Sequence, residues 1–250
     1  MKKVVVFTLR LISTFGFWNG LWLSIRFGFG RIENIQLPNI SHPLSLRPDT
    51  SDYETFYQVF LVDEYNVDFV KNPKVIIDGG ANIGLFSIKM KNKFPDATIV
   101  CIEPDHENFH LLQKNLSLYK NIFFENCGIW SSDTRLKVFD KFNLGKWGMM
   151  VEEDLVNGNV DAISLNSLLK KYNIQSVDIL KLDIETSEKQ VFLENYEEWL
   201  PKVKMIIIEF HDRIEEGCAK PFFVAINKHF NQYSYSTQGE NTIIVNKDIS

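Results

Sequence analysis

A glycine-rich segment, VIIDGGANIG at residues 75–84, has the composition of a ligand-binding turn. It starts as a β-branched run and leads into residues with helical spacing, so it predicts a turn between a strand and a helix. Glycines in such a turn allow positive φ angles and let the backbone approach a ligand closely. Asp78 stands at the entrance of this turn. The segment therefore predicts a binding loop that begins with a carboxylate.

The spacing within this loop argues against two common nucleotide sites. A phosphate loop has the pattern GxxxxGK[ST], but Leu85 and Phe86 stand where its lysine and hydroxyl residue belong. A dinucleotide fingerprint has the pattern GxGxxG, and this fails at Asn82. The carboxylate of Asp78 would also repel a pyrophosphate at the start of the helix. Nucleoside triphosphates and nicotinamide dinucleotides are thus disfavoured.

The same carboxylate suits a cationic ligand. S-adenosylmethionine carries an ammonium group and a sulfonium group, and it has no phosphate. Glu103 lies 25 residues after Asp78, at the end of the next apolar run, where its two oxygens can accept both ribose hydroxyls. The pattern DxGxNxG, followed by an acid at the end of the next strand, therefore predicts an S-adenosylmethionine site.

The elements that position these residues alternate along the chain. Strands are predicted at residues 74–77, 97–102, 122–125, 135–139, 177–182 and 203–210, and helices at 82–93, 106–119, 165–172, 188–199 and 222–230. A capping box, Ser187 with Gln190, is expected to start the helix at 188–199. Two last runs, 233–236 and 242–245, flank the turn QGEN and predict an antiparallel hairpin. This alternation predicts an α/β fold with a mostly parallel sheet covered by helices on both faces.

Ligands of such sheets bind at the carboxyl ends of the strands. Four acidic residues occupy those positions here: Asp78, Glu103, Asp183 and Glu209. A carboxylate at one strand end can simply cap a helix. Four at equivalent positions predict a site for positive charge or for hydroxyl groups.

Several stretches of the chain resemble the FkbM family of methyltransferases. They are VIIDGGANIGLFS (75–87), CIEPDHENFHLLQKNL (101–116), ENCGIWSS (125–132), LKLDIETSEKQVF (180–192) and KMIIIEFHD (204–212), and the segment 46–65 upstream is also similar. The similarity as a whole, with the residues between these stretches, covers about 200 residues. The resemblance implies a class I methyltransferase (Rossmann-like) fold, with a seven-stranded sheet that ends in a reversed hairpin. It also implies methyl transfer from S-adenosylmethionine to an acceptor oxygen, commonly a hydroxyl of a sugar or a natural product.

The resemblance also implies which residues bind the cofactor. Glu103 would take the ribose, with Pro104 and Asp105 shaping its edge. Asp183 and Glu185 match the family segment DxEGxE beside the reacting centre. The methionine part and the adenine would be bordered by two further groups, Asp78, Gly79, Gly80, Asn82 and Gly84 for the first and Cys127, Gly128 and Ile129 for the second.

This sequence departs from the family at Thr186, where a glycine is usual. Because this position lies near the reacting centre, the change could narrow or reshape the acceptor pocket. The stretch 145–153, GKWGMMVEE, predicts a loop on the acceptor side in which Trp147 stacks on a sugar ring.

A sugar hydroxyl is a weak nucleophile, so a general base would assist the transfer. The candidates are His211 with Glu209, and Asp183. Alternatively, Asp183, Glu209 and His211 could hold a divalent ion that lowers the pKa of the acceptor hydroxyl. No adjacent pair of metal-ligating residues follows the strand at 177–182, so we expect no metal.

The first 32 residues contain five bases and no acid, whereas the whole chain has a net charge of −5. The 15 uncharged residues between Arg10 and Arg26 are too few to span a bilayer, which takes about 20. One interpretation is a helical arm that packs its Phe and Trp residues on the main domain. The other is an interfacial arm that places Trp18, Trp22 and Phe27 in the headgroup layer while its bases meet anionic lipid.

Composition sets the remaining limits. Hydrophobic residues make up 45% of the chain, enough for a globular core. No basic cluster interleaved with aromatic residues is present, so we expect no nucleic-acid partner. The three cysteines lie far apart, which argues against a disulfide framework and for a reducing, cytoplasmic compartment. We divide the chain into an arm with its connector (1–50) and a methyltransferase domain (51–250). The proline-punctuated stretch 37–50 is predicted to be an extended connector with short edge strands.

The sequence therefore predicts an S-adenosylmethionine-dependent O-methyltransferase that acts on a hydroxyl of a sugar, a glycan or glycolipid, or a natural product. The alternative is a non-catalytic cofactor-binding module in a glycan-assembly complex. The basic, aromatic arm adds the expectation of peripheral contact with the inner face of the cytoplasmic membrane.

Overall fold

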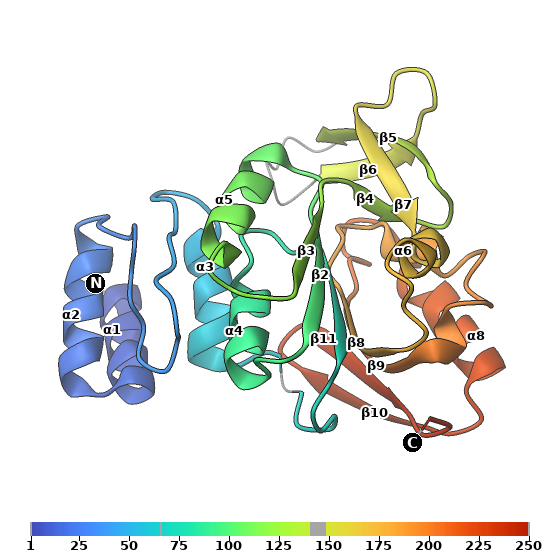
Figure 1. Ribbon diagram of the computed structural model, residues 1–250. Helices are drawn as coiled ribbons and strands as arrows, with labels where there is room; N and C mark the ends of the chain where they lie inside the picture. The colour runs from blue at the N-terminus through green and yellow to red at the C-terminus, as the bar shows by residue number, and fades with distance from the viewer. Residues whose placement is uncertain (1, 66, 141–148, 250) are drawn as a thin grey trace.

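A seven-stranded sheet forms the centre of the computed structural model, which describes residues 2–65, 67–140 and 149–249 (Figure 1). Its strand order is β10-β11-β9-β8-β1-β2-β3. The strands are β1 (Val75–Gly79), β2 (Thr98–Ile102), β3 (Ile122–Glu125), β8 (Val177–Leu182), β9 (Val203–Glu209), β10 (Tyr233–Gln238) and β11 (Asn241–Asn246). Adjacent strands from β9 to β3 pair in parallel, while β11 is antiparallel to both β9 and β10. This topology confirms the predicted class I methyltransferase fold with its C-terminal hairpin.

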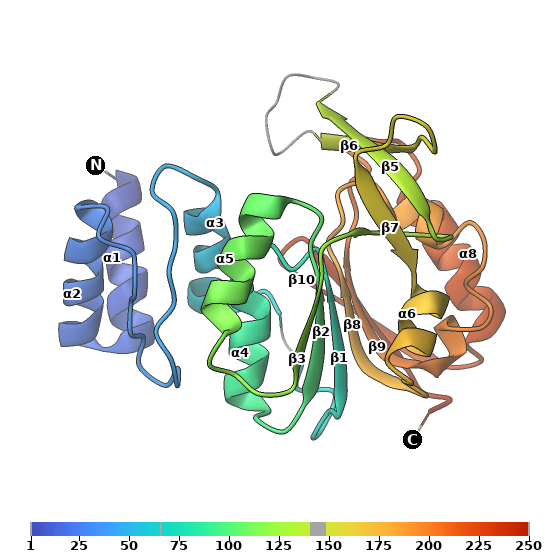
Figure 2. The same ribbon diagram turned by 45° about the horizontal axis from the view of Figure 1, so that its top comes forward.

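Both faces of the sheet are buried under helices, as Figures 1 and 2 show. One face carries α4 (Leu85–Lys93) and α5 (His106–Leu116), and the other carries α6 (Leu165–Lys171), α7 (Glu188–Val191) and α8 (Ala219–His229). Successive residues of a strand point to opposite faces. Accordingly, Ile76 belongs to the core under α4 and α5, and Ile77 belongs to the core under α6 and α8. This double burial explains the near-continuous apolar runs of the central strands.

A second sheet was not predicted. It has the order β4-β7-β5-β6 and lies beyond the carboxyl ends of the central strands (Figure 1). Its strands are β4 (Gly128–Trp130), β5 (Thr134–Asp140), β6 (Met149–Glu153) and β7 (Val160–Ser164). Only the run at 135–139 was expected to be a strand, because the three residues of β4 are too few to show an alternating pattern. Met149–Glu153 belongs to β6 and not to a loop, and Trp147 lies outside the described residues.

The helix predicted at 188–199 is much shorter in the structure, and its capping box is absent. α7 ends at Val191, and the side chain of Ser187 makes no capping hydrogen bond. Glu188 instead turns inward, where its Oε1 accepts a hydrogen bond from the backbone N–H of Ile184 at 3.0 Å. Asn195, with φ of 61°, takes a left-handed conformation that does not continue a helix.

The N-terminal arm is a helical hairpin of α1 (Lys2–Phe15) and α2 (Phe17–Gly28). Gly20 lets the two helices approach closely, because a Cβ there would lie 2.4 Å from the Cα of Ile12. The hairpin packs on α3 (Asp52–Phe56) and on the π-helical turn η1 (Tyr57–Val62). Phe27 contacts Phe56 with ring centroids 5.0 Å apart. The hairpin therefore shares the core cluster that lies under α4 and α5.

The arm only partly follows either sequence interpretation. Phe27 is 6% exposed, so placing it in a headgroup layer was wrong. Trp18 and Trp22 are exposed, so they do not pack on the domain. The described part of the connector at 37–50 contains no strand, and its one bridge pairs Ile35 with Leu44. Among the described helices, none is long and apolar enough to cross a membrane.

Candidate active site

A cavity of about 440 Å³ lies at the carboxyl ends of β1, β2, β8 and β9 and is roofed in part by the second sheet. Its size falls within the range of roughly 300–1,000 Å³ that is usual for small-molecule pockets. Twelve of the residues predicted for the site line it: Gly80, Asn82, Glu103, Pro104, Asp105, Cys127, Gly128, Ile129, Asp183, Glu185, Glu209 and His211. Asp78, Gly79 and Gly84 lie outside its wall. The structure therefore brings most of the predicted residues together in one pocket.

The glycine turn after β1 is fixed by its neighbours on both sides. The backbone N–H groups of Gly80 and Ala81 both donate to the carbonyl of Ile102, each at 3.0 Å. Gly80 has φ of 70°, and a Cβ at this position would lie 1.7 Å from the carbonyl oxygen of Asp183. No residue other than glycine fits there without moving the end of β8. The turn is thus wedged between the ends of β2 and β8.

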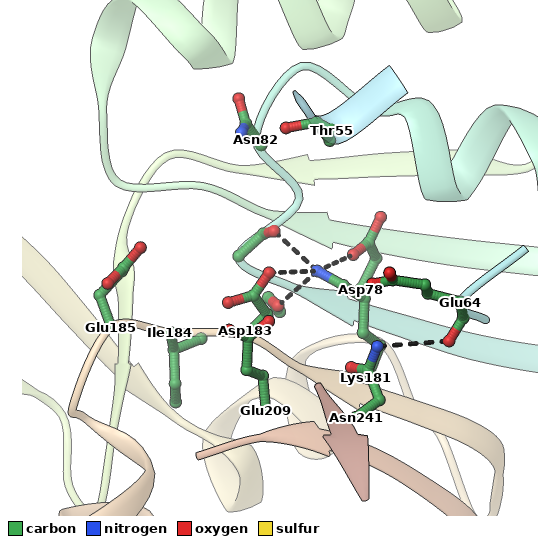
Figure 3. A network of polar contacts seen from close by, with 12 residues as sticks. Thr55, Glu64, Asp78, Asn82, Lys181, Asp183, Ile184, Glu185, Glu209 and Asn241 are labelled. Carbon is green, nitrogen blue, oxygen red and sulfur yellow. Dashed lines mark hydrogen bonds and ion pairs between the residues drawn. The ribbon is translucent and has the colours of Figure 1, made fainter. Parts of the chain in front are cut away.

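Asp78 is fully buried below this turn and holds a buried lysine. Its Oδ2 accepts a hydrogen bond from Ser87 at 2.6 Å, and its Oδ1 lies 3.3 Å from Nζ of Lys181. Lys181 also donates to the carbonyl of Gly80 at 2.9 Å, and its Nζ is 3.8 Å from Asp183. Figure 3 shows the ammonium between the turn and these two carboxylates. Asp78 therefore acts on the pocket through Lys181, and not as part of its wall.

Sequence reasoning missed Lys181. A signal for it was present, since Lys181 is the one base within the mainly apolar strand VDILKL. Burial lowers the pKa of its ammonium, but the adjacent carboxylates of Asp78 and Asp183 outweigh this effect and raise the pKa. Lys181 is consequently a fixed positive charge that joins β1, β8 and the glycine turn.

Glu103, at the end of β2, is held by three N–H donors. Its Oε2 accepts from the backbone of Asn82 at 2.8 Å, and its Oε1 accepts from the backbone of Asp105 at 3.0 Å and from the amide of Asn108 at 3.4 Å. Burial raises the pKa of Glu103 to about 7, although these hydrogen bonds oppose the rise. A carboxylate offers about four acceptor positions. The carboxylate therefore retains capacity for about one further donor, such as a hydroxyl group in the pocket.

His211 lies just beyond β9, with its two ring nitrogens in different surroundings. Nδ1 is 3.0 Å from Oε1 of Glu188, a fully buried carboxylate. Nε2 lies between three other carboxylate oxygens, at 3.6 Å from Glu185, 3.7 Å from Glu209 and 3.9 Å from Asp183. These separations are longer than a hydrogen bond. The imidazole is thus oriented by Glu188 on one side and faces the pocket carboxylates on the other.

Glu188 was missed as a site residue, although the DxEGxE pattern ends on it. The sequence placed it only in a helix. Its carboxylate contacts Nδ1 of His211. In many catalytic sites such a partner fixes the tautomer and the ring orientation of a histidine. Asp183, Glu209 and His211 each present a ligand atom within 4.8 Å of the others, a spacing that a small cation could also use.

The carboxylates of this cluster outnumber its positive charges, and this raises the pKa of several of its groups. Burial lowers the pKa of His211, but the hydrogen bond and charge of Glu188, with Glu185 and Asp183, raise it overall to about 9. Burial and the charge of Asp183 raise the pKa of Glu209 to about 8. Burial raises the pKa of Glu185 to about 7. A cation bound beside these carboxylates would keep them ionised and would lower the pKa of His211 towards neutrality.

The stability of the ligand-free protein is expected to fall as the pH rises from about 5 to 9. His211, Glu209 and Glu185 all have pKa values above their ordinary values of 6.5, 4.5 and 4.5, so the folded state holds more protons than the unfolded chain over this interval. Each group stabilises the fold below its unfolded pKa and loses that contribution as the pH passes its folded pKa. Calorimetric unfolding across this range should show the midpoint falling by on the order of 5 °C. In His211→Gln the fall between pH 6.5 and 9 should be smaller; an identical profile would contradict the assignment.

The sequence led us to expect that Thr186 reshapes the acceptor pocket. Thr186 does not line the pocket, so it has no direct contact through which it could do so. Its side chain is buried, and its φ of 74° is in the left-handed region that favours glycine. A β-branched residue in this conformation is strained by about 1–3 kcal/mol. The glycine usual in the family therefore reflects a backbone requirement.

Comparing Thr186→Gly with Thr186→Ala isolates this strain. Alanine keeps the unfavourable φ and glycine relieves it, so we expect the glycine variant to be more stable by about 1 kcal/mol in chemical denaturation. The matched control is Gln113, an exposed residue of α5. There the alanine variant should be the more stable one by about 0.5–1 kcal/mol. The same order at both positions would show that Thr186 is unstrained.

The fold, the pocket and its surplus of carboxylates together define an S-adenosylmethionine-dependent methyltransferase of class I topology. The Methyltransferase FkbM domain matches residues 78–237, well over half of the chain. The protein therefore belongs to the FkbM methyltransferase family.

Two sequence relatives, both named methyltransferases, agree with this placement. Methyltransferase 1 of Beauveria bassiana (strain ARSEF 2860) is 24% identical over 205 residues, which cover 72% of this chain and 82% of the relative. Methyltransferase sdnD of Sordaria araneosa is 26% identical over 188 residues, which cover 62% of this chain and 73% of the relative. Fibrillarin of Aeropyrum pernix, solved with natively bound S-adenosyl-L-methionine, aligns with a TM-score of 0.42 at 12% identity over 76% of this chain and 73% of its own.

The pocket fits the cofactor of this family. S-adenosylmethionine supplies an activated methyl group on a sulfonium. Its positive charges match the carboxylates of Asp183 and Glu185, and a ribose hydroxyl matches the remaining acceptor position of Glu103. Oδ1 of Asn82 is buried and, within the described residues, has no hydrogen-bond partner, so it can accept an ammonium N–H. We expect the adenine to lie beside Gly128 and Ile129, which line the pocket.

Proposed function

We propose that this protein is an O-methyltransferase that methylates a hydroxyl group of a sugar, a glycan or glycolipid, or a natural product. The observation that carries the proposal is the pair formed by Glu188 and His211, whose Nδ1 and Oε1 atoms are 3.0 Å apart. A hydroxyl acceptor needs a base, and the pair supplies one with a fixed orientation at the pocket wall.

In this mechanism the protein holds the acceptor oxygen in line with the bond that breaks between sulfur and the methyl carbon. His211 Nε2 accepts the hydroxyl proton as the new bond between oxygen and the methyl carbon forms. Glu188 keeps the other nitrogen protonated and stabilises the imidazolium that results. The positive charge of the bound cofactor favours the neutral imidazole before the reaction, because it lowers the pKa of His211.

The polarity of the pocket supports a hydroxyl-rich acceptor. Around His211 the wall contains the charged side chains of Glu209, Arg213 and Glu240. Arg213 lies 3.4 Å from Glu240 and 3.9 Å from Glu209. An apolar acceptor would displace water from these charged groups without replacing its hydrogen bonds, whereas sugar hydroxyls can donate to the carboxylates and accept from the guanidinium. This favours a sugar or another polyhydroxylated acceptor.

Calorimetry tests the cofactor first, with S-adenosylmethionine, S-adenosylhomocysteine and NAD as ligands. Binding of the first two without NAD is expected. A screen of free sugars, nucleotide sugars, lipid-linked sugars and hydroxylated natural products then follows, with S-adenosylhomocysteine release as the readout. Turnover that survives a chelator supports His211 as the base, and turnover that needs added Mg²⁺ would replace this mechanism with metal assistance. Tight cofactor binding with no turnover on any acceptor would favour the non-catalytic module.

A further inference from the structure

The outward face of α2 is an apolar surface that the described chain leaves uncovered. Trp18 is 79% exposed, Trp22 45%, Ile25 53% and Phe29, which caps the helix, 75%. At 3.6 residues per turn the four side chains project from one side of the helix. Leu21 and Phe17, both exposed, extend the same side. We call these six residues the α2 face.

The opposite side of α2 already has its partners. Gly20, Leu23 and Phe27 are buried there against α1 and the main domain. Figures 1 and 2 both place α2 at the outer edge of the molecule, away from the central sheet. Rotation of α2 about its axis would not remove the exposed apolar surface. It would bury the α2 face but expose Leu23 and Phe27, which are also apolar.

Isolated exposed apolar residues are normal, but six on one helical face indicate a binding surface. Two of the six are tryptophans, whose rings favour the boundary between hydrocarbon and water. The same segment carries its charge with one sign. Lys2, Lys3, Arg10, Arg26 and Arg31 are the charged residues of positions 1–32, and the first acid is Glu33.

Some of these bases are held close to the α2 face. The Arg26 guanidinium lies 4.9 Å from the centroid of the Trp22 ring and donates to the carbonyls of Arg31 and Glu33. The Arg31 guanidinium is 5.9 Å from the Phe29 ring. Cationic groups thus border the aromatic residues. The other 218 residues carry a net charge of −10, since −5 − (+5) = −10.

We propose that the α2 face docks the protein on an anionic membrane surface, with α2 lying in the plane of the headgroups and not crossing the bilayer. The apolar side chains would enter the headgroup boundary, and the bases would meet lipid phosphates. A second copy of the chain is the less suitable occupant, because two α2 faces in contact would bring together two segments of +5 each. The inference does not depend on the proposed acceptor.

Co-sedimentation of the full chain with vesicles tests this docking. The vesicles are phosphatidylcholine alone, or phosphatidylcholine mixed with phosphatidylglycerol. Binding is expected only to the mixed vesicles, with a blue shift of tryptophan emission and a decrease as salt rises. Trp18→Ser combined with Trp22→Ser should weaken binding by at least about tenfold. Arg10→Glu should weaken it by at least about fivefold.

Matched variants elsewhere separate docking from general stickiness. Leu155→Ser combined with Val156→Ser removes two well-exposed apolar side chains, and Lys120→Glu reverses an exposed base that is not part of the hairpin. Neither should change vesicle binding, and all variants should keep the thermal midpoint of the parent. Absence of binding to the mixed vesicles would overturn the proposal. So would equal losses in test and control variants, or a dimer in sedimentation velocity that the tryptophan variant dissociates.

Discussion

Replacing Lys181 with methionine is expected to destabilise the protein by about 3–5 kcal/mol and to abolish cofactor binding. Methionine fills a similar volume but leaves the carboxylate of Asp78 buried without its cation, and Oδ1 of Asp78 has no other hydrogen-bond partner among the described residues. It also removes the ammonium that holds the carbonyl of Gly80 and the carboxylate of Asp183. Chemical denaturation measures the first effect and calorimetry with S-adenosylmethionine the second.

Two controls define this prediction. Adding Asp78→Asn to Lys181→Met removes the stranded charge, so the double variant should recover most of the stability while cofactor binding stays weak. Lys93→Met breaks the ion pair of Lys93 with Asp68, in which both side chains are well exposed, and should cost less than about 1 kcal/mol. A loss for Lys181→Met as small as that for Lys93→Met would show that Lys181 is not needed under the glycine turn.

Replacing His211 with glutamine is expected to lower kcat by about 10²–10⁴ once an acceptor is in hand. The reason is that the amide can occupy the same space but cannot take the hydroxyl proton. The Kd for S-adenosylmethionine should not rise, because the cofactor is expected to be held mainly by Glu103 and the glycine turn, and the neutral amide removes a positive charge that opposes the cationic cofactor. Steady-state kinetics beside calorimetric binding separate the two quantities.

Glu188 and His110 supply the comparison for this second prediction. Glu188→Gln keeps a hydrogen-bonding oxygen beside Nδ1 but removes the charge, so we expect a smaller loss of kcat and a pH–rate profile displaced to lower pH. His110→Gln changes an exposed histidine of α5 outside the pocket wall and should leave kcat unchanged. If His211→Gln kept the parent kcat, Asp183 or Glu209 would have to be the base.

The sequence was most informative where one pattern repeats over several elements. The strands at 75–79 and 203–209 could be predicted because they are buried on both faces and consist mainly of apolar residues. The acidic residues at the carboxyl ends of the parallel strands could be placed at one edge of the sheet, because parallel strands end on the same side. Asp183, Glu209 and His211 do meet in the pocket.

The sequence was least informative where a side chain's role depends on distant contacts. The residues near Asp78 in the sequence do not indicate that its side chain turns away from the pocket towards Lys181. The two residues meet because β1 pairs with β8, which lies about 100 residues later in the chain. Glu188 looks like an ordinary first-turn acid of a helix, where acids are common. The second sheet was missed because three of its strands are short, with 3, 5 and 5 residues, and because β4 pairs with β7, from which β5 and β6 separate it in the chain.

The position of β11 has a consequence for the order in which the fold can be completed. β9 pairs with β8 on one side and with β11 on the other, although β11 comes after all the other described strands in the chain. Until β11 arrives, the edge of β9 presents unpaired backbone groups along the run VKMIIIE. An apolar open edge of this kind is a template for pairing with another chain. During synthesis the protein is therefore expected to stay vulnerable to aggregation until the hairpin of β10 and β11 closes the edge of β9.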